Sequence, residues 1–508
     1  MLALRNRSYL LSSLIGIAVI AVISRDYLDL PLWIDELHTS WTLLADWNTV
    51  SERALAGNQS PLYFYLLKLV VSVTGQTETS LRVFSTTCAC ISVIVLNWLC
   101  YRHQLKLLAT LLTTVSFAAG HLQLLFAVEA RSYSLLTLLI LILFCVSSMR
   151  WRKTHNAQDE VKKAIGWRLE FTWSLVATLC IYTHYMAIPA IGSLLLAHLF
   201  ACPAPFGIRM KAFILQVFVL GVLIAAQFDT LENIYNHRNQ WATFIRAEHA
   251  TFEALLTKLP VLSTLVLPGI CLIVFRPQSM ALKPLILGSL ILAVVPYLTA
   301  WTTTRLDWVN WFFPRYLVTC LPALSLFCGF SVAAIAQSSK SFFTPALVGI
   351  GCLLVFVLFD SRAIQNHLEG TITLKNERWD TVAKTLHAKA RPDDIIFLAG
   401  GLIEDTRLPK LADAKYTANI TTEEYCAFPL NGMYPIPEGL RVQPISDYRQ
   451  PSLLAQRLKA ASKGWLVVRG RGYNQKAEQV LIETFGNDGY KDHMLPGKVN
   501  LYFFERLE

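Results

Sequence analysis

The first 360 residues of the chain consist of long apolar runs separated by short polar segments. A helix needs roughly 20 apolar residues to cross the hydrocarbon core of a bilayer, so these runs predict about eleven membrane spans. The pattern is therefore that of a polytopic α-helical membrane protein. The predicted spans lie near residues 9–23, 79–100, 105–120, 131–149, 169–184, 186–201, 212–229, 253–275, 282–300, 314–336 and 342–359.

One further apolar segment, residues 61–75, is short and contains a lysine, so it either crosses the membrane or lies flat on it. If it lies flat, the basic loops from Arg102 to Lys340 fall on the same side as Arg5 and Arg7, as the positive-inside rule requires. We therefore expect an interfacial helix at 61–75 within a first outer loop. The segments expected outside are 25–78, 120–130, 229–252, 301–313 and everything after residue 360.

From residue 361 onward the long apolar runs give way to short alternating elements. Alternation of helix and strand is typical of a small α/β domain. We therefore divide the chain into a transmembrane domain, residues 1–360, and a soluble extracytoplasmic α/β domain, residues 361–508. Helices are predicted at 378–390, 451–462 and 474–484, and strands at 395–398, 465–468 and 499–504.

The composition agrees with a membrane protein. Only 16% of the residues are charged, against about 25% in an average soluble protein. The net charge of +10 lies mostly in short loops, where it is expected to set topology rather than bind nucleic acid. Arg25 and Asp26 follow the first run without a small-residue cleavage site, which indicates a retained span rather than a cleaved signal. Ten of the eleven cysteines lie in or beside apolar runs, so no disulfide framework is expected.

Asp35 and Glu36 follow the first span at the expected outer surface of the membrane. A helix start explains such a pair without any chemistry, because carboxylates near a helix N-terminus interact favourably with the macrodipole. The pair also suits a chemical role. Sugar transfer from a polyprenyl phosphate needs a carboxylate that takes the proton of the acceptor hydroxyl near the lipid head groups. Asp35 is the candidate for this base.

Candidate cations for a lipid phosphate lie at the outer ends of three predicted spans, at Arg82, Arg131 and Arg315. A cation that faces the phosphate stabilises it as a leaving group. For any one of these arginines taken alone, a simpler explanation than phosphate binding is that the side chain extends from the helix end to the membrane interface. Glu129 and Arg131 begin one span without facing each other, so each is expected to meet a different group. His184 lies in an outer turn, where it either bonds substrate or has a structural role.

The order and sidedness of these motifs resemble the GT-C superfamily of glycosyltransferases. The similarity is to the branch of protein O-mannosyltransferases and aminoarabinose transferases, including bacterial lipopolysaccharide-sugar transferases. It covers nearly all of the membrane part, at residues 35–36, 60–63, 78–82, 129–133, 183–185, 315–316 and 321–322. The resemblance assigns catalytic roles to Asp35 and Glu36. It assigns substrate binding to Gln59, Pro61, Tyr63, Arg82, Glu129, Arg131, Tyr133, His184, Tyr185, Arg315 and Tyr316.

The resemblance implies transfer of a sugar from a polyprenyl-phosphate-linked donor to a glycan, lipid or protein acceptor, usually with inversion at the anomeric carbon. Asp35 then corresponds to the acidic base of the first outer loop, and Glu36 is its neighbour or support. The implied location is a bacterial inner or plasma membrane, with the active site and the C-terminal domain on the extracytoplasmic side.

The chain departs from the family at one motif. Relatives of the aminoarabinose-transferase type often have a Lys-Pro-Pro stretch whose lysine contacts the lipid phosphate, whereas this chain has Gln59, Ser60 and Pro61. The phosphate contact is therefore expected from one or more of the three outer arginines.

Two other classes of protein remain alternatives. A transporter or flippase of lipid-linked sugars would place ionisable groups along a path through the spans, whereas here they gather at the outer ends. A non-catalytic scaffold would not need two acids at the outer surface. The sequence indicates no definite cofactor. A divalent metal could be bound if four side chains converged in the fold, which spacing alone does not establish: Asp35, Glu36, His38 and His184.

Overall fold

The structure is a computed structural model, and it describes residues 2–44, 46–156, 167–236, 244–277, 281–339, 341, 343–362, 377–402, 404–408, 420–493 and 495–506. The chain folds as two compact units. The first comprises Met1–Leu28 and Val50–Ile372, and the second comprises Asp29–Thr49 and Thr373–Glu508. The start of the loop after the first span therefore folds together with the C-terminal part of the chain.

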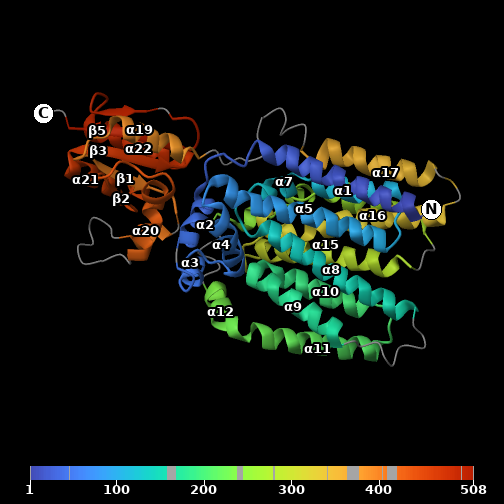
Figure 1. Cartoon of the computed structure of the whole chain (residues 1–508). Coiled ribbons are helices and arrows are strands. Elements are labelled where there is room, and N and C mark those ends of the chain that lie inside the picture. Colours follow the sequence, from blue (N-terminus) through green and yellow to red (C-terminus); the bar gives the residue numbers. More distant parts are fainter. Residues whose placement is uncertain are drawn as a thin grey trace. The chain divides into compact units, whose positions relative to one another are not determined.

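The first unit is a bundle of helices (Figure 1). Its longer helices pack through apolar faces, and α16 is buried along almost its whole length. The helices are α1 (Leu2–Arg25), α3 (Val50–Ala56), α4 (Leu62–Thr74), α5 (Glu78–Arg102), α6 (Leu107–Ala118), α7 (His121–Ala127), α8 (Tyr133–Asn156), α9 (Trp167–Thr183), α10 (Ile188–Ala201), α11 (Phe206–Ile224), α12 (Phe228–Asn236), α13 (Phe252–Thr257), α14 (Leu267–Phe275), α15 (Lys283–Arg305), α16 (Leu321–Ser338) and α17 (Phe343–Val355). Shorter helical turns are η1 (Tyr185–Ala187), η4 (Leu262–Val266) and η5 (Pro314–Cys320).

Seven helices of the described chain are long and apolar enough to cross a membrane, or eight if the bent pair α6 and α7 forms one span. The chain is therefore a multi-pass membrane protein, as its apolar runs predicted. The predicted spans beyond these seven fall on helices that are shorter or bent. Three shorter apolar helices are Leu62–Thr74, Tyr185–Ala201 and Leu262–Phe275.

Two short helices, α4 and α7, lie in the segments that the sequence places outside the membrane. The 13 residues of α4 extend about 20 Å at 1.5 Å per residue, which is too short to cross a hydrocarbon core of about 30 Å. The sequence predicted an outer segment at 120–130 and no helix there, whereas the structure forms α7 after a bend of 59°. The reason is that Gly120 interrupts the helix locally, with ψ of 131°, and an apolar stretch then resumes the helix.

Close packing between α8 and α15 depends on one glycine. A Cβ added to Gly288 would lie 2.2 Å from Cη2 of Trp151, a side chain that is 2% exposed. We expect Gly288→Ala to destabilise the fold by about 1–3 kcal/mol, because a well-packed interior does not accept an extra methyl group without strain. Thermal unfolding in detergent micelles measures the difference. Gly221→Ala in α11 is the matched control, since an added Cβ there has no neighbour within 4 Å, and equal melting temperatures for the two variants would contradict the expectation.

The second unit contains a five-stranded mixed sheet with strand order β2-β1-β3-β5-β4 (Figure 1). Strand β1 pairs in parallel with β2 and β3, while β5 pairs in antiparallel fashion with β3 and β4. The strands are β1 (Ile395–Ala399), β2 (Arg441–Pro444), β3 (Lys463–Arg469), β4 (Tyr490–Asp492) and β5 (Val499–Glu505). The helices are α2 (Ile34–Leu44), α19 (Trp379–Lys389), α20 (Ile420–Phe428), α21 (Pro451–Ala461) and α22 (Arg471–Phe485), with turns η7 (Glu404–Arg407) and η8 (Pro429–Met433).

The predicted small α/β fold of the C-terminal chain is thereby confirmed. The three predicted helices correspond to α19, α21 and α22, and the three predicted strands to β1, β3 and β5. The alternating side chains of these strands form the core, which includes Phe397, Leu466, Val468, Tyr502 and Phe504.

Candidate functional site

The two acids after the first span have different surroundings in the structure. They lie in the first turn of α2. Glu36 is 1% exposed, and its Oε2 accepts a hydrogen bond from the main-chain N–H of Trp33 at 3.3 Å. This contact satisfies one of the N–H groups that a helix start leaves without an intrahelical partner. Asp35 is only partly buried. Glu36 thus has the structural role that a helix start requires, and Asp35 is the more accessible carboxylate.

The chain just before Asp35 is held by two hydrogen bonds to the C-terminal residues. The main-chain N–H of Leu32 donates to Oη of Tyr434 at 2.7 Å, and the N–H of Ile34 donates to Oε2 of Glu377 at 3.0 Å. Both N–H groups are buried. The position of Asp35 is therefore set within the second unit by residues that lie more than 300 positions later in the sequence.

Helix α2 packs against α20 and η8 through aromatic side chains. Tyr425 meets the ring of His38 edge-on at 5.2 Å between centroids and lies 5.0 Å from the ring of Trp41. Ser40 donates a hydrogen bond to Sδ of Met433 at 3.6 Å. His38 is 2% exposed, so it packs in the interior of the second unit rather than facing solvent.

A carboxyl group that the sequence did not indicate lies close to Asp35. Glu404, in η7, is 5% exposed. Burial raises the pKa of its carboxyl to about 7, and the negative charge of Asp35 acts in the same direction. Burial also raises the pKa of Asp405 to about 6, although Oη of Tyr448 donates a hydrogen bond to this carboxylate at 2.6 Å. Asp35 therefore has beside it an acid that holds its proton up to neutral pH.

The raised pKa of Glu404 predicts a pH dependence of stability. Unfolding returns the pKa to its ordinary value of 4.5, so between pH 4.5 and 7 the unfolded chain releases a proton that the folded chain keeps. Stability therefore falls as pH rises through this window and stays lower above it. We expect the wild type to lose about 2–3 kcal/mol relative to Glu404→Gln between pH 5 and pH 8.

Melting curves of the two full-length proteins in detergent at pH 5, 6, 7 and 8 measure this difference. Glu438→Gln, at an exposed carboxyl of the same unit, is the control and should follow the wild type. Parallel curves for the wild type and Glu404→Gln would contradict the assigned protonation.

In the first unit, four predicted aromatic residues gather at the ends of helices. The ring of His184 lies 5.7 Å from that of Tyr133, 4.8 Å from that of Tyr185 and 6.3 Å from that of Tyr316, measured between centroids. Tyr133 begins α8, His184 and Tyr185 lie between α9 and α10, and Tyr316 lies in η5. The structure thus brings together residues from three predicted motifs.

Two arginines act electrostatically on this cluster. Burial lowers the pKa of His184 to about 3, and the positive charges of Arg131 and Arg315 add to this effect. The ring is therefore neutral. Its Nδ1 accepts a hydrogen bond from the main-chain N–H of Met186 at 3.2 Å, so the proton of the neutral ring lies on Nε2. The guanidinium of Arg315 also stacks over the ring of Tyr316 at 5.2 Å. An anion bound here would meet two cations and a neutral imidazole.

The turn that carries Arg131 is fixed by hydrogen bonds from α5 and α8. Oγ of Ser85 donates to the carbonyl of Arg131 at 3.3 Å, and Oγ1 of Thr86 donates to the carbonyl of Ala127 at 2.7 Å. Oγ of Ser134 donates to the carbonyl of Phe126 at 2.8 Å. Glu129, in the same turn, is 3% exposed. The backbone around Arg131 is therefore preorganised.

Arg82 has a different environment. It is 4% exposed, and its Nη1 donates hydrogen bonds to the carbonyls of Tyr27 and Leu28 at 3.0 and 3.2 Å. These contacts hold the chain where it leaves α1. They support a structural role for Arg82 and leave Arg131 and Arg315 as the stronger candidates for an anion.

The predicted residues around α4 are packed in the interior of the first unit. Tyr63 is fully buried against Phe64 and Phe84, at 5.5 and 5.8 Å between ring centroids. Pro61 lies at the N-cap of α4, and Gln59 is 8% exposed. The predicted site residues thus divide between the units, with Asp35 and Glu36 in the second and all the others in the first. Within the described ranges, no group of three or more His, Cys, Asp or Glu residues is placed to hold a metal ion.

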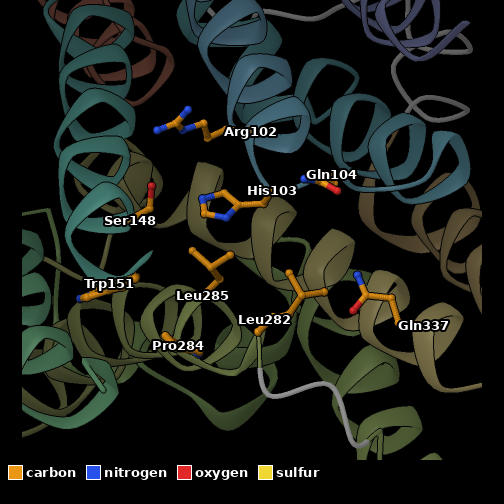
Figure 2. A pocket seen from close by; sticks show the side chains of 10 residues that line it. Arg102, His103, Gln104, Ser148, Trp151, Leu282, Pro284, Leu285 and Gln337 are labelled. Atoms are coloured by element: carbon orange, nitrogen blue, oxygen red, sulfur yellow. The ribbon is translucent and has the colours of Figure 1, made fainter. Parts of the chain in front are cut away.

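A cavity of about 350 Å³ lies elsewhere in the first unit, and its lining comes from the ends of four helices (Figure 2). Arg102 ends α5, whereas Arg82 lies near its start. Trp151 lies near the end of α8, which begins at Tyr133. Gln337 lies near the end of α16, the helix that directly follows η5 and its Arg315. The cavity is therefore at the opposite end of these helices from the cluster around His184.

Comparison with known proteins relates the chain to solved structures only. No family model matches the sequence, and no curated protein matches it significantly. The structure of ArnT from Cupriavidus metallidurans in the apo state matches with a TM-score of 0.54 and 12% identity, over 96% of this chain and 97% of that one. ArnT bound to undecaprenyl phosphate matches with a TM-score of 0.49, 11% identity and the same coverage. Mycobacterial arabinofuranosyltransferase AftD matches with a TM-score of 0.48 and 13% identity, over 99% of this chain and 42% of that one.

The likeness to apo ArnT extends over nearly the whole of both chains, including the C-terminal domain. The chain therefore shares the fold of ArnT, and the resemblance inferred from its motifs is confirmed at the level of the fold.

Proposed function

We propose that this protein is a membrane glycosyltransferase that moves a sugar from a polyprenyl-phosphate-linked donor to a glycan, lipid or protein acceptor. One observation carries the proposal: the rings of Tyr133, His184, Tyr185 and Tyr316 gather at the helix ends of a bundle with the GT-C fold, next to the turn of Arg131 and under the guanidinium of Arg315. Such an arrangement suits a phosphate group, which needs fixed positive charge and hydrogen-bond donors near the lipid head groups.

The reaction follows from the proposed roles. Asp35 takes the proton of the acceptor hydroxyl, and the acceptor oxygen forms a bond to the anomeric carbon. The bond from that carbon to the phosphate oxygen breaks, and the polyprenyl phosphate leaves with the electron pair. Attack from the face opposite the phosphate inverts the anomeric configuration. No separate acid is needed, because a phosphate whose charge is stabilised is already a good leaving group.

The phosphate contacts are assigned to Arg131 and Arg315, whose positive charges act together at His184. The Nε2 proton of His184 donates to a phosphate or sugar oxygen. Tyr133, Tyr185 and Tyr316 form the aromatic wall of this site and suit a sugar ring, which stacks well on such side chains. Glu36 supports the helix that carries Asp35.

The proposed orientation places these groups and the C-terminal domain on the extracytoplasmic side of a bacterial plasma membrane. It rests on the basic residues at the opposite helix ends, including Arg102, Arg150 and Lys283, which the positive-inside rule assigns to the cytoplasm.

Purified protein in proteoliposomes, supplied with radiolabelled polyprenyl-phosphate sugars and membrane-extracted acceptors, tests the function. We expect label to move from the donor lipid to an acceptor, and we expect a polyprenyl phosphate or its sugar derivative in the mass spectrum of the co-purified lipids. Movement of intact labelled lipid between leaflets without transfer would instead support a transporter and overturn the proposal.

A further inference from the structure

A single buried carboxylate in the second unit connects the first turn of α2 to the sheet. Glu377 is 3% exposed. Its Oε2 accepts hydrogen bonds from the main-chain N–H of Ile34 at 3.0 Å and from Nε1 of Trp379 at 3.1 Å. Its Oε1 accepts a hydrogen bond from Nε of Arg469 at 2.8 Å. The three partners that the described residues provide for this carboxylate are all donors, and one of them is a cation, so the cost of burying the negative charge of Glu377 is compensated.

The hydrogen-bond partners of Glu377 connect the start of α2 to the end of a sheet strand. Ile34 directly precedes Asp35. Arg469 is the last residue of β3, and its Nη1 also points to the carbonyl of Gly400 at 3.4 Å, just after β1. Strands β1 and β3 are parallel neighbours, so their carboxyl ends meet at one edge of the sheet. Glu377 thus connects the residue before Asp35 to the carboxyl ends of the parallel strands β1 and β3.

We infer that Glu377 is a positioning residue for Asp35, so that the C-terminal domain sets the geometry of the proposed general base. This inference rests on the proposed function, in which Asp35 takes a proton from the acceptor. A base must lie within hydrogen-bond reach of that proton, and a misplacement of about 1 Å can reduce a rate by about a hundredfold. A main-chain hydrogen bond from the preceding residue to a buried ion pair limits such movement.

The substitution Glu377→Gln tests this role with almost no change in side-chain shape. Because every partner is a donor, the amide NH2 of glutamine must face one of them, and the ion pair with Arg469 is lost. We expect kcat for sugar transfer to fall by at least about tenfold while KM for the lipid donor changes less than about twofold. We also expect faster hydrogen–deuterium exchange in the peptide that contains residues 32–36.

Asp394→Asn is the matched control. This buried carboxylate accepts hydrogen bonds from Nε1 of Trp465 at 2.9 Å and from the main-chain N–H of Arg391 at 3.0 Å, and it lies 3.9 Å from Nζ of Lys463. Its set of partners matches that of Glu377, but it lies just before β1, at the amino end of that strand, and these contacts do not include α2. The control should lose comparable stability while keeping the wild-type kcat and the wild-type exchange of residues 32–36.

Each outcome decides the inference. Wild-type kcat and wild-type exchange in Glu377→Gln would overturn it, as would equal losses in both variants, which would mark a general loss of stability. A selective effect of Glu377→Gln on kcat and on exchange supports it. If the wild type transfers no sugar, the proposed function fails, whereas the exchange experiment still decides whether Glu377 holds the segment before Asp35.

Discussion

Asp35→Asn should lower sugar transfer by at least about a hundredfold in a protein that still folds. Asparagine keeps the size and shape of the side chain but lacks the basic oxygen that would take the acceptor proton. The measurement is the initial rate of labelled-sugar transfer in proteoliposomes at saturating donor. Binding of the donor lipid should change little, because Asp35 acts on the acceptor hydroxyl and not on the phosphate.

Asp46→Asn is a suitable control, since Asp46 lies in the same part of the second unit and its side chain is exposed. It should transfer sugar at the wild-type rate. Near-normal transfer by Asp35→Asn, in a sample with the wild-type melting temperature, would remove Asp35 from the role of general base.

The second large effect is expected at the arginines of the first unit. Arg131→Gln and Arg315→Gln should each weaken use of the lipid donor by about 10- to 100-fold in kcat/KM, because a hydrogen bond to a charged group contributes about 1.5–3 kcal/mol. The structural reason is that both guanidinium groups act on His184, where we place the phosphate. Transfer rates measured over a range of donor concentrations give this value for each variant.

Arg102→Gln provides the comparison for both variants. Arg102 is also an arginine at the end of a long helix, but it lines the cavity at the opposite end of α5. Its substitution should leave kcat/KM unchanged. An equal loss in Arg102→Gln would mean that the effect comes from the overall positive charge of the protein and not from a phosphate site around His184.

The local pattern of the sequence predicted those strands whose residues are mostly buried. Strand β1 has buried residues along nearly its whole length and was predicted within one residue of its end. Strand β2 was missed because none of its residues is fully buried and it ends in a proline. Strand β4 has only three residues, which is too few for a periodic pattern to be detected. Edge strands of this kind depend on their neighbours more than on their own sequence.

The candidate site was predictable only in part, for a similar reason. Asp35 stands out because it follows a membrane span, but the importance of Glu377 and Glu404 depends on burial against segments far away in the sequence. From the sequence alone, the three outer arginines are also equivalent candidates for binding the lipid phosphate. The structure separates them, because the guanidinium of Arg82 donates to main-chain carbonyls near the end of α1.

The discontinuous second unit has a consequence for biosynthesis. Its α2 segment leaves the ribosome early, yet the partners of Leu32 and Ile34 follow 402 and 343 positions later. Closure of so long a connection must wait until almost the entire polypeptide has been translated and inserted. A nascent or prematurely terminated product that ends before residue 377 would therefore carry Asp35 on a segment that lacks both of these partners, so the second unit is completed only late in synthesis.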